Sequence, residues 1–220
     1  MSYDIGFRPT LDDVITAMSR KNYRIFNTPS RPFNLNIVGI RSRTQVPNQF
    51  DDWLTVFYRS NDQWIFNTFP ATTDPGLYFL GDERMGTDRG TAILKPGQYR
   101  GAYELGKHQG RYKALVQGGS VTVLRDFDRD EELDFDSDRT ETGHFGINIH
   151  RANRDRASIQ VDNWSAGCQV ICDPLQFNHF LDLCEKGKQE WGNSFTYTLL
   201  TQGDLEPRER MSPLFRPFGN

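Results

Sequence analysis

Short apolar and polar stretches alternate along most of the chain, and this pattern predicts many strands and few helices. Residues 34–42 (NLNIVGIRS) are apolar at both alternating sets of positions, which indicates a strand buried on both faces. Two runs rich in aromatic and β-branched residues, 51–59 and 63–71, flank the turn residues Ser60-Asn61-Asp62. This arrangement predicts a β-hairpin.

Further strands are expected in the second half of the chain. The segment 114–128 predicts another hairpin, turning at Gly118-Gly119. In FGINIH (145–150), Phe145 and the isoleucines alternate with smaller or polar residues, which predicts a strand with one core face. The run SFTYTLL (194–200) predicts a closing strand.

Two segments carry helical periodicity and helix-start signals. Thr10 and Asp13 form a capping box in front of a helix expected over 10–23. Asp173 as N-cap and Pro174 at the first helical position open a second helix, expected to run to Lys186. Its predicted inner stripe is Phe177, Phe180, Leu181 and Cys184.

The fold class expected from these elements is mostly β, a β-rich α+β domain with an N-terminal and a C-terminal helix. One catalytic domain is expected over 1–202, with 1–33 as the first helix and its lead-in. Residues 203–220 are rich in Arg and Pro and are expected to form an extended or disordered tail.

Composition narrows the functional classes. A net charge of -3 with no basic stripe argues against a nucleic-acid partner, and no stretch is long and apolar enough for a membrane span. The first residues, MSYDIGFRPTLDD, lack a signal-peptide pattern, so synthesis in the cytoplasm is expected. An odd number of cysteines, 3, argues against a disulfide framework. Cys172 and Cys184 are expected to be buried hydrophobic residues.

The candidate chemistry lies between His150 and Cys168. His150 falls on the polar face of its predicted strand with Asn148, so that face can open into a cleft. A neighbouring His can take the proton of a Cys thiol and so activate it as a nucleophile. In Ser165-Ala166-Gly167-Cys168, glycine gives the backbone freedom to turn and to point N–H groups at a developing oxyanion.

These residues resemble the L,D-transpeptidase (YkuD-type) catalytic domain. That family pairs a strand His with a downstream Ser/Thr-His-Gly-Cys, and here His150, Ser165, Gly167 and Cys168 stand at the matching positions. The resemblance implies a mixed β-sheet or sandwich core, a Cys168 nucleophile and a His150 acid/base. Asn148, Arg151 and Trp164 complete the expected oxyanion and substrate-binding set, with Ser165 and Gly167.

Two upstream stretches, 73–78 and 95–99, both look like the Thr-Pro-x-Gly-x-Phe/Tyr segment of that family, and the choice between them stays open. The chain departs from the family at Ala166, where a His is usual, and at Gln169-Val170, which leave no Arg just after the Cys. Arg151, Arg154 and Arg156 are the candidate replacements.

The resemblance implies action on peptidoglycan peptide stems, by cleaving or exchanging an amide through a thioester, with no metal and no cofactor. The pattern also resembles uncharacterised phage and prophage proteins, so hydrolysis of the wall after release, delivery or lysis is favoured over transpeptidation. The oligomeric state stays open. The alternative function is a non-catalytic phage structural or cell-wall-binding module with a buried Cys.

The sequence also contains residues for two candidate metal sites. A zinc site from His150, Cys168, Cys172 and His179 matches no common closed zinc pattern. The acidic stretch 126–138 has aspartates at alternate positions, but Glu131 and Ser137 replace the Gly and Glu of an EF-hand loop. A solvated acidic loop is the preferred interpretation, and a weak non-EF cation site stays open.

Overall fold

The computed structural model describes residues 6–44, 46–81, 90–128, 130–135 and 138–206. Its helices are α1 (Leu11–Arg20), α2 (Leu77–Leu80), α3 (Pro174–Trp191) and α4 (Gln202–Leu205). Its strands are β1 (Asn36–Arg41), β2 (Asp52–Ser60), β3 (Gln63–Thr72), β4 (Thr91–Leu94), β5 (Gly97–His108), β6 (Tyr112–Gln117), β7 (Val121–Asp126), β8 (Thr140–Gly143), β9 (Ile149–Arg151), β10 (Gln169–Ile171) and β11 (Phe195–Thr201). None of the described helices is long and apolar enough to cross a membrane.

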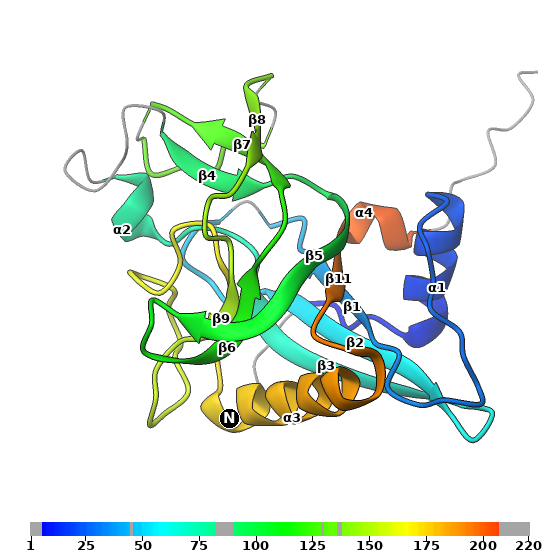
Figure 1. Cartoon of the computed structure of the whole chain (residues 1–220). Coiled ribbons are helices and arrows are strands. Elements are labelled where there is room, and N and C mark those ends of the chain that lie inside the picture. The colour runs from blue at the N-terminus through cyan, green and yellow to red at the C-terminus, as the bar shows by residue number, and fades with distance from the viewer. Residues whose placement is uncertain (1–5, 45, 82–89, 129, 136–137, 207–220) are drawn as a thin grey trace, which may run out of the picture.

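The strands form two sheets, and the β-rich α+β class is confirmed (Figure 1). The larger sheet is a closed barrel in the order β1-β11-β5-β6-β9-β10-β3-β2, and the smaller one has the order β4-β7-β8. The barrel is mixed, because β1 runs parallel to β11 and β9 runs parallel to β10, whereas its other neighbours are antiparallel.

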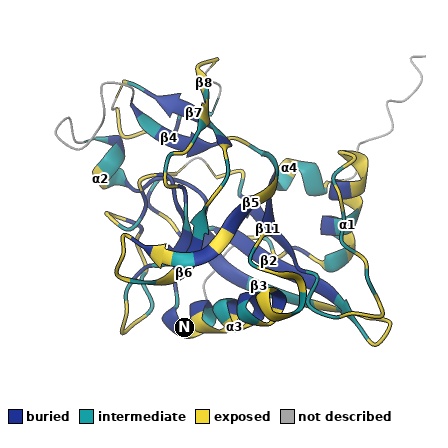
Figure 2. Ribbon diagram, viewed as in Figure 1, coloured by how far each residue is buried: buried dark blue, intermediate teal, exposed yellow. Residues whose placement is uncertain are grey.

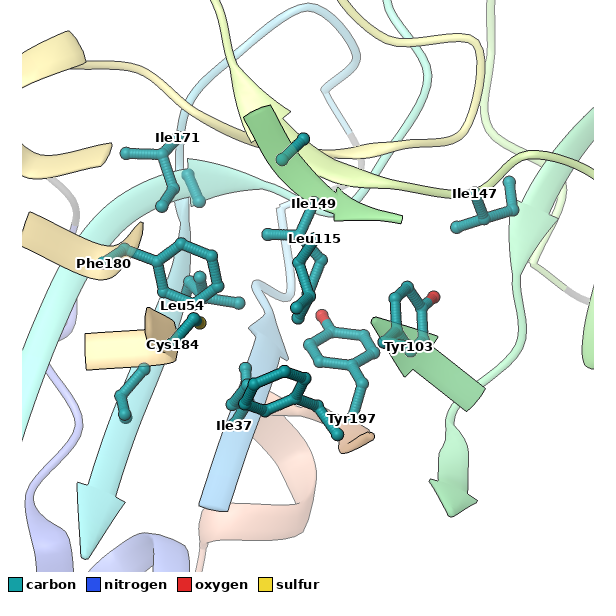
Figure 3. Close-up of a cluster of buried hydrophobic side chains, with 14 of the residues drawn as sticks. Ile37, Leu54, Tyr103, Leu115, Ile147, Ile149, Ile171, Phe180, Cys184 and Tyr197 are labelled. Carbon is teal, nitrogen blue, oxygen red and sulfur yellow. The ribbon is translucent and has the colours of Figure 1, made fainter. Parts of the chain in front are cut away.

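The barrel interior is filled by one large apolar cluster, and α3 packs against it. Tyr103 and Tyr197 lie side by side in this interior with ring centroids 5.6 Å apart (Figure 3). Phe180 and Cys184 of α3 join the same cluster, so the helix covers the barrel with a buried stripe (Figure 2). The expected stripe is confirmed except that Leu183, rather than Leu181, is its most buried leucine.

The two helix starts are confirmed, but the first helix ends at Arg20 instead of continuing to Tyr23. The side chain of Thr10 accepts from the backbone N–H of Asp13, and that carboxylate accepts from the backbone N–H of Thr10. The Asp173 carboxylate accepts from the Leu175 N–H, with Pro174 in the first turn. The second helix runs to Trp191, one turn beyond its predicted end, and a positive-φ Gly192 ends it.

The hairpin of β2 and β3 is confirmed, with Asn61 and Asp62 at positive φ in its turn. The hairpin predicted over 114–128 is wrong. The N–H groups of Gly118 and Gly119 both donate to the carbonyl of Ala102, so the chain passes from the barrel into the second sheet instead of folding back. Two consecutive strands show the same alternation of apolar and polar residues whether they pair with each other or belong to different sheets. The sequence pattern therefore does not distinguish a hairpin from a change of sheet.

Two other boundaries differ from expectation. Only the end of the strand predicted at 145–150 is paired, as β9, because β10 and β6 reach no farther along it. Residues 203–205 belong to α4, which a capping box between Thr201 and Asp204 begins, and so they are not extended. Glu206 has extended backbone, as predicted for the tail, and residues 207–220 lie outside the described residues.

Candidate active site

The parallel pair β9 and β10 places His150 and Cys168 on one face of the barrel wall. The register pairs Ile149 with Gln169 and His150 with Val170, and the Gln169 N–H donates to the Asn148 carbonyl at 2.9 Å. Paired residues in parallel strands point to the same side. Ile149 points into the barrel core, so His150 and Cys168 both face away from it.

Outside the barrel wall, Cys168 belongs to a small separate apolar cluster. The cluster comprises Phe50, Ala152, Val161, Cys168, Val170 and Cys172, with Trp164 packed against it. Cys168 is 8% exposed, whereas Cys172 and Cys184 are fully buried. None of the three cysteines, all of which lie in the described part of the chain, forms a disulfide. The two cysteines expected to be buried hydrophobic residues are therefore placed as predicted.

Backbone groups hold the Cys168 sulfur. The Asn148 N–H donates to Sγ at 3.4 Å, and Sγ donates to the Gly146 carbonyl at 3.4 Å. Burial raises the pKa of the Cys168 thiol to about 11, against the lowering effect of the Asn148 N–H. Cys168 therefore rests as a neutral thiol at pH 7.

His150 is fixed in one tautomer by a backbone carbonyl. Its Nδ1 lies 2.8 Å from the Arg151 carbonyl oxygen, which can only accept a hydrogen bond, so Nδ1 carries the proton. Its Nε2 then keeps its lone pair, and this atom is buried with no hydrogen-bond partner in the described part of the chain. Burial and the neighbouring His108 lower the pKa of His150 to about 3, so the imidazole is neutral at pH 7.

Two further side chains contact the His150 imidazole. The His108 ring stacks on the His150 ring with centroids 4.0 Å apart. The Tyr112 hydroxyl lies 3.2 Å from Nδ1 of His150 and donates to the Arg151 carbonyl at 3.4 Å. Sequence reasoning missed both residues, since they lie on β5 and β6, about 40 positions upstream, and nothing in the His–Cys motif refers to them.

Asn148 has a different partner from the one expected. It is expected in the oxyanion and substrate-binding set, but its amide nitrogen lies 3.1 Å from Nδ1 of His108, and its amide oxygen accepts from the Gln117 N–H. Asn148 therefore orients His108, while the Arg151 carbonyl orients His150. Burial, with Arg111 and Arg151 nearby, lowers the pKa of His108.

Ser165 and Gly167 shape the turn that carries Cys168. The Ser165 hydroxyl donates to the Cys168 carbonyl at 2.8 Å and accepts from the Gly167 N–H at 3.1 Å. Gly167 has φ +106, and a Cβ there would lie 2.0 Å from the Ala92 carbonyl oxygen of β4. Ser165 is buried and the Gly167 N–H is used within the turn, so in this state neither lines an oxyanion pocket as expected.

The remaining predicted site residues differ in their contacts and in how far they are exposed. The Arg151 guanidinium stacks on the Tyr112 ring at 4.2 Å and donates to the Ala152 carbonyl. Trp164 is half-buried beside Cys168. Arg154 and Arg156 are exposed, and Arg154 Nε lies 3.8 Å from the Asp155 carboxylate. His179, weighed as a zinc ligand, instead lies on α3 with Nε2 3.2 Å from the Asn67 side-chain oxygen.

Of the two upstream stretches, the one at 73–78 contacts the Cys turn. The Gly76 N–H donates to the Ser165 carbonyl at 2.9 Å, and a Cβ on Gly76 would lie 2.0 Å from the Asp162 carbonyl oxygen. A cleft of about 430 Å³ opens beside this contact, and its lining includes Tyr78, Glu131 and Asp162.

The site thus presents a neutral thiol and a neutral imidazole on one face, with the free lone pair of the imidazole on Nε2. Such a pair can perform acyl transfer, with sulfur as nucleophile and Nε2 as proton acceptor. Searches against models of known protein families and against curated proteins found no match to this chain.

Proposed function

We propose that this protein is a cysteine enzyme that cleaves an amide in peptidoglycan peptide stems through a Cys168 thioester, with hydrolysis favoured over exchange. The observation that carries the proposal is the hydrogen bond from His150 Nδ1 to the Arg151 carbonyl. It leaves Nε2, on the face shared with Cys168, without a partner among the described residues. A structural histidine has no need of a buried ring nitrogen without a partner, since that costs stability.

The proposed chemistry follows from the protonation states at rest. As Sγ of Cys168 attacks the substrate carbonyl, Nε2 of His150 takes the thiol proton. The resulting imidazolium gives that proton to the leaving amine, and a thioester remains. Water then attacks the thioester with His150 as base, which releases a carboxylic acid and restores the thiol. An amine in place of water would give exchange.

A second candidate function has its own supporting observation. Cys168 is only 8% exposed and its pKa is raised by burial, as for a packed structural thiol. A non-catalytic wall-binding or phage structural module would have these properties and would need no imidazole base.

The deciding experiment compares muropeptides released from purified cell wall by the wild type and by Cys168→Ala. Cys172→Ala is the matched control, since it removes a thiol from the same apolar cluster. New stem fragments with the wild type and with Cys172→Ala, but not with Cys168→Ala, would support hydrolysis, and mass-shifted stems would support exchange. Unchanged wall with all three proteins, alongside retained wall binding in a pull-down, would favour the binding module.

A further inference from the structure

The end of β7 gathers three carboxylates away from the His–Cys pair. Asp126 is the last residue of β7, and Asp128 and Asp134 lie in the segment that leads to β8. One carboxylate oxygen from each lies within 4.8 Å of the other two. Exposed acidic residues often cluster without function, so the burial of the individual members decides the interpretation.

Asp126 is the member that points to a ligand. It is 2% exposed, and its Oδ2 is buried with no hydrogen-bond partner among the residues that the structure describes. A buried carboxylate oxygen without a donor is costly unless a cation or proton neutralises it. Burial, followed by the charge of Asp134, raises the pKa of Asp126 to about 6.

We propose that Asp126, Asp128 and Asp134 bind one Ca²⁺ ion. Three carboxylates supply only oxygen ligands, which select a hard cation over zinc or copper. Calcium accepts roughly six to eight oxygen ligands at about 2.3–2.6 Å in flexible geometry, whereas magnesium requires a near-ideal octahedron at about 2.0–2.1 Å. A loop with irregular ligand spacing also suits the flexible coordination of calcium better than the octahedron of magnesium.

Bound calcium would fasten the segment between β7 and β8 to the second sheet. Leu133 and Phe135, next to Asp134 in the chain, pack in an apolar cluster with Leu80, Ile93 and Leu124. An ion shared by Asp126 and Asp134 would therefore tie the end of β7 to the start of this packed segment. Because the ion binds the folded arrangement of the three carboxylates, its binding should raise the melting temperature.

The test uses full-length, chelator-treated protein and calcium chloride, with magnesium chloride as the comparison salt. Isothermal titration calorimetry should show one site per chain, with a dissociation constant at or below the millimolar values known for weak calcium modules. The melting temperature should rise with calcium and much less with magnesium. Asp126→Asn keeps the size of the side chain, and we expect it to weaken calcium binding at least tenfold.

Asp155→Asn is the matched control, because it removes an exposed carboxylate from a different loop. Should Asp126→Asn fail to fold, as judged by circular dichroism, the exposed Asp128→Asn takes its place. Absence of both calcium heat and a melting shift in the wild type would overturn the site. Equal responses to calcium and magnesium would overturn the choice of ion, and equal loss in Asp155→Asn would overturn the location.

Discussion

Replacing Gly167 with alanine should destabilise the protein more than a positive φ alone explains. Gly167 has φ +106, and its added Cβ would lie 2.0 Å from the Ala92 carbonyl oxygen, a backbone atom of β4 that cannot rotate away. A non-glycine residue in the left-handed region costs about 1–2 kcal/mol, and overpacking a tight contact costs about 1–3 kcal/mol more. The expected loss in unfolding free energy is therefore about 2–5 kcal/mol.

Gly110→Ala separates the two contributions. Gly110 has φ +71 in the turn between β5 and β6, and a Cβ there would meet nothing within 4 Å. This variant should lose only the conformational part, about 1–2 kcal/mol. Urea denaturation of both variants and the wild type measures the difference directly. Equal losses of unfolding free energy in the two variants would refute the argument that the close contact between Gly167 and β4 adds to the cost of the substitution.

Three further outcomes follow from the site. Alkylation of Cys168 by iodoacetamide should be slow at pH 7 and accelerate toward pH 11, since its pKa is about 11. Mass mapping should nevertheless find that Cys168 reacts faster than Cys184, because Cys184 is fully buried. Equal alkylation rates at the two cysteines would contradict the effect of this difference in exposure. His150 has a folded pKa of about 3, below its ordinary 6.5, so the unfolded state binds the proton first and stability should fall as pH drops from about 6.5 toward 3. In denaturant titrations, the wild type should lose more unfolding free energy over that pH range than His150→Gln does. If the unfolding free energies of the two proteins fall in parallel with pH, His150 is not the cause. Ser165→Ala leaves the buried Gly167 N–H without its acceptor, and should cost about 1–3 kcal/mol in the same denaturation assay.

Local signals predicted the elements well where one physical cause dominates. The Thr10 and Asp173 caps and the Asn61-Asp62 turn are each determined by a few neighbouring side chains, and all are confirmed. The hairpin predicted at Gly118-Gly119 failed because the choice between pairing and changing sheets depends on Ala102, which is distant in the chain. Sequence periodicity carries no information on such a partner.

The candidate site was likewise predicted from the sequence only in part. The motif identified His150 and Cys168, and the β9–β10 register places them on one face. It did not identify His108 or Tyr112, because they reach His150 only through the pairing of β6 with β9 and of β5 with β6. It also left open which group orients His150, since that partner is the Arg151 carbonyl, while Asn148 contacts His108.

The resting protonation states constrain how the proposed enzyme can work. Burial raises the pKa of the Cys168 thiol to about 11 and lowers the pKa of His150 to about 3, so both shifts oppose transfer of the proton from sulfur to the imidazole before substrate binds. A preformed ion pair is therefore disfavoured, and proton transfer to Nε2 must accompany attack on the carbonyl. The same burial that keeps the thiol unreactive toward solvent would then confine its reactivity to a bound acyl substrate.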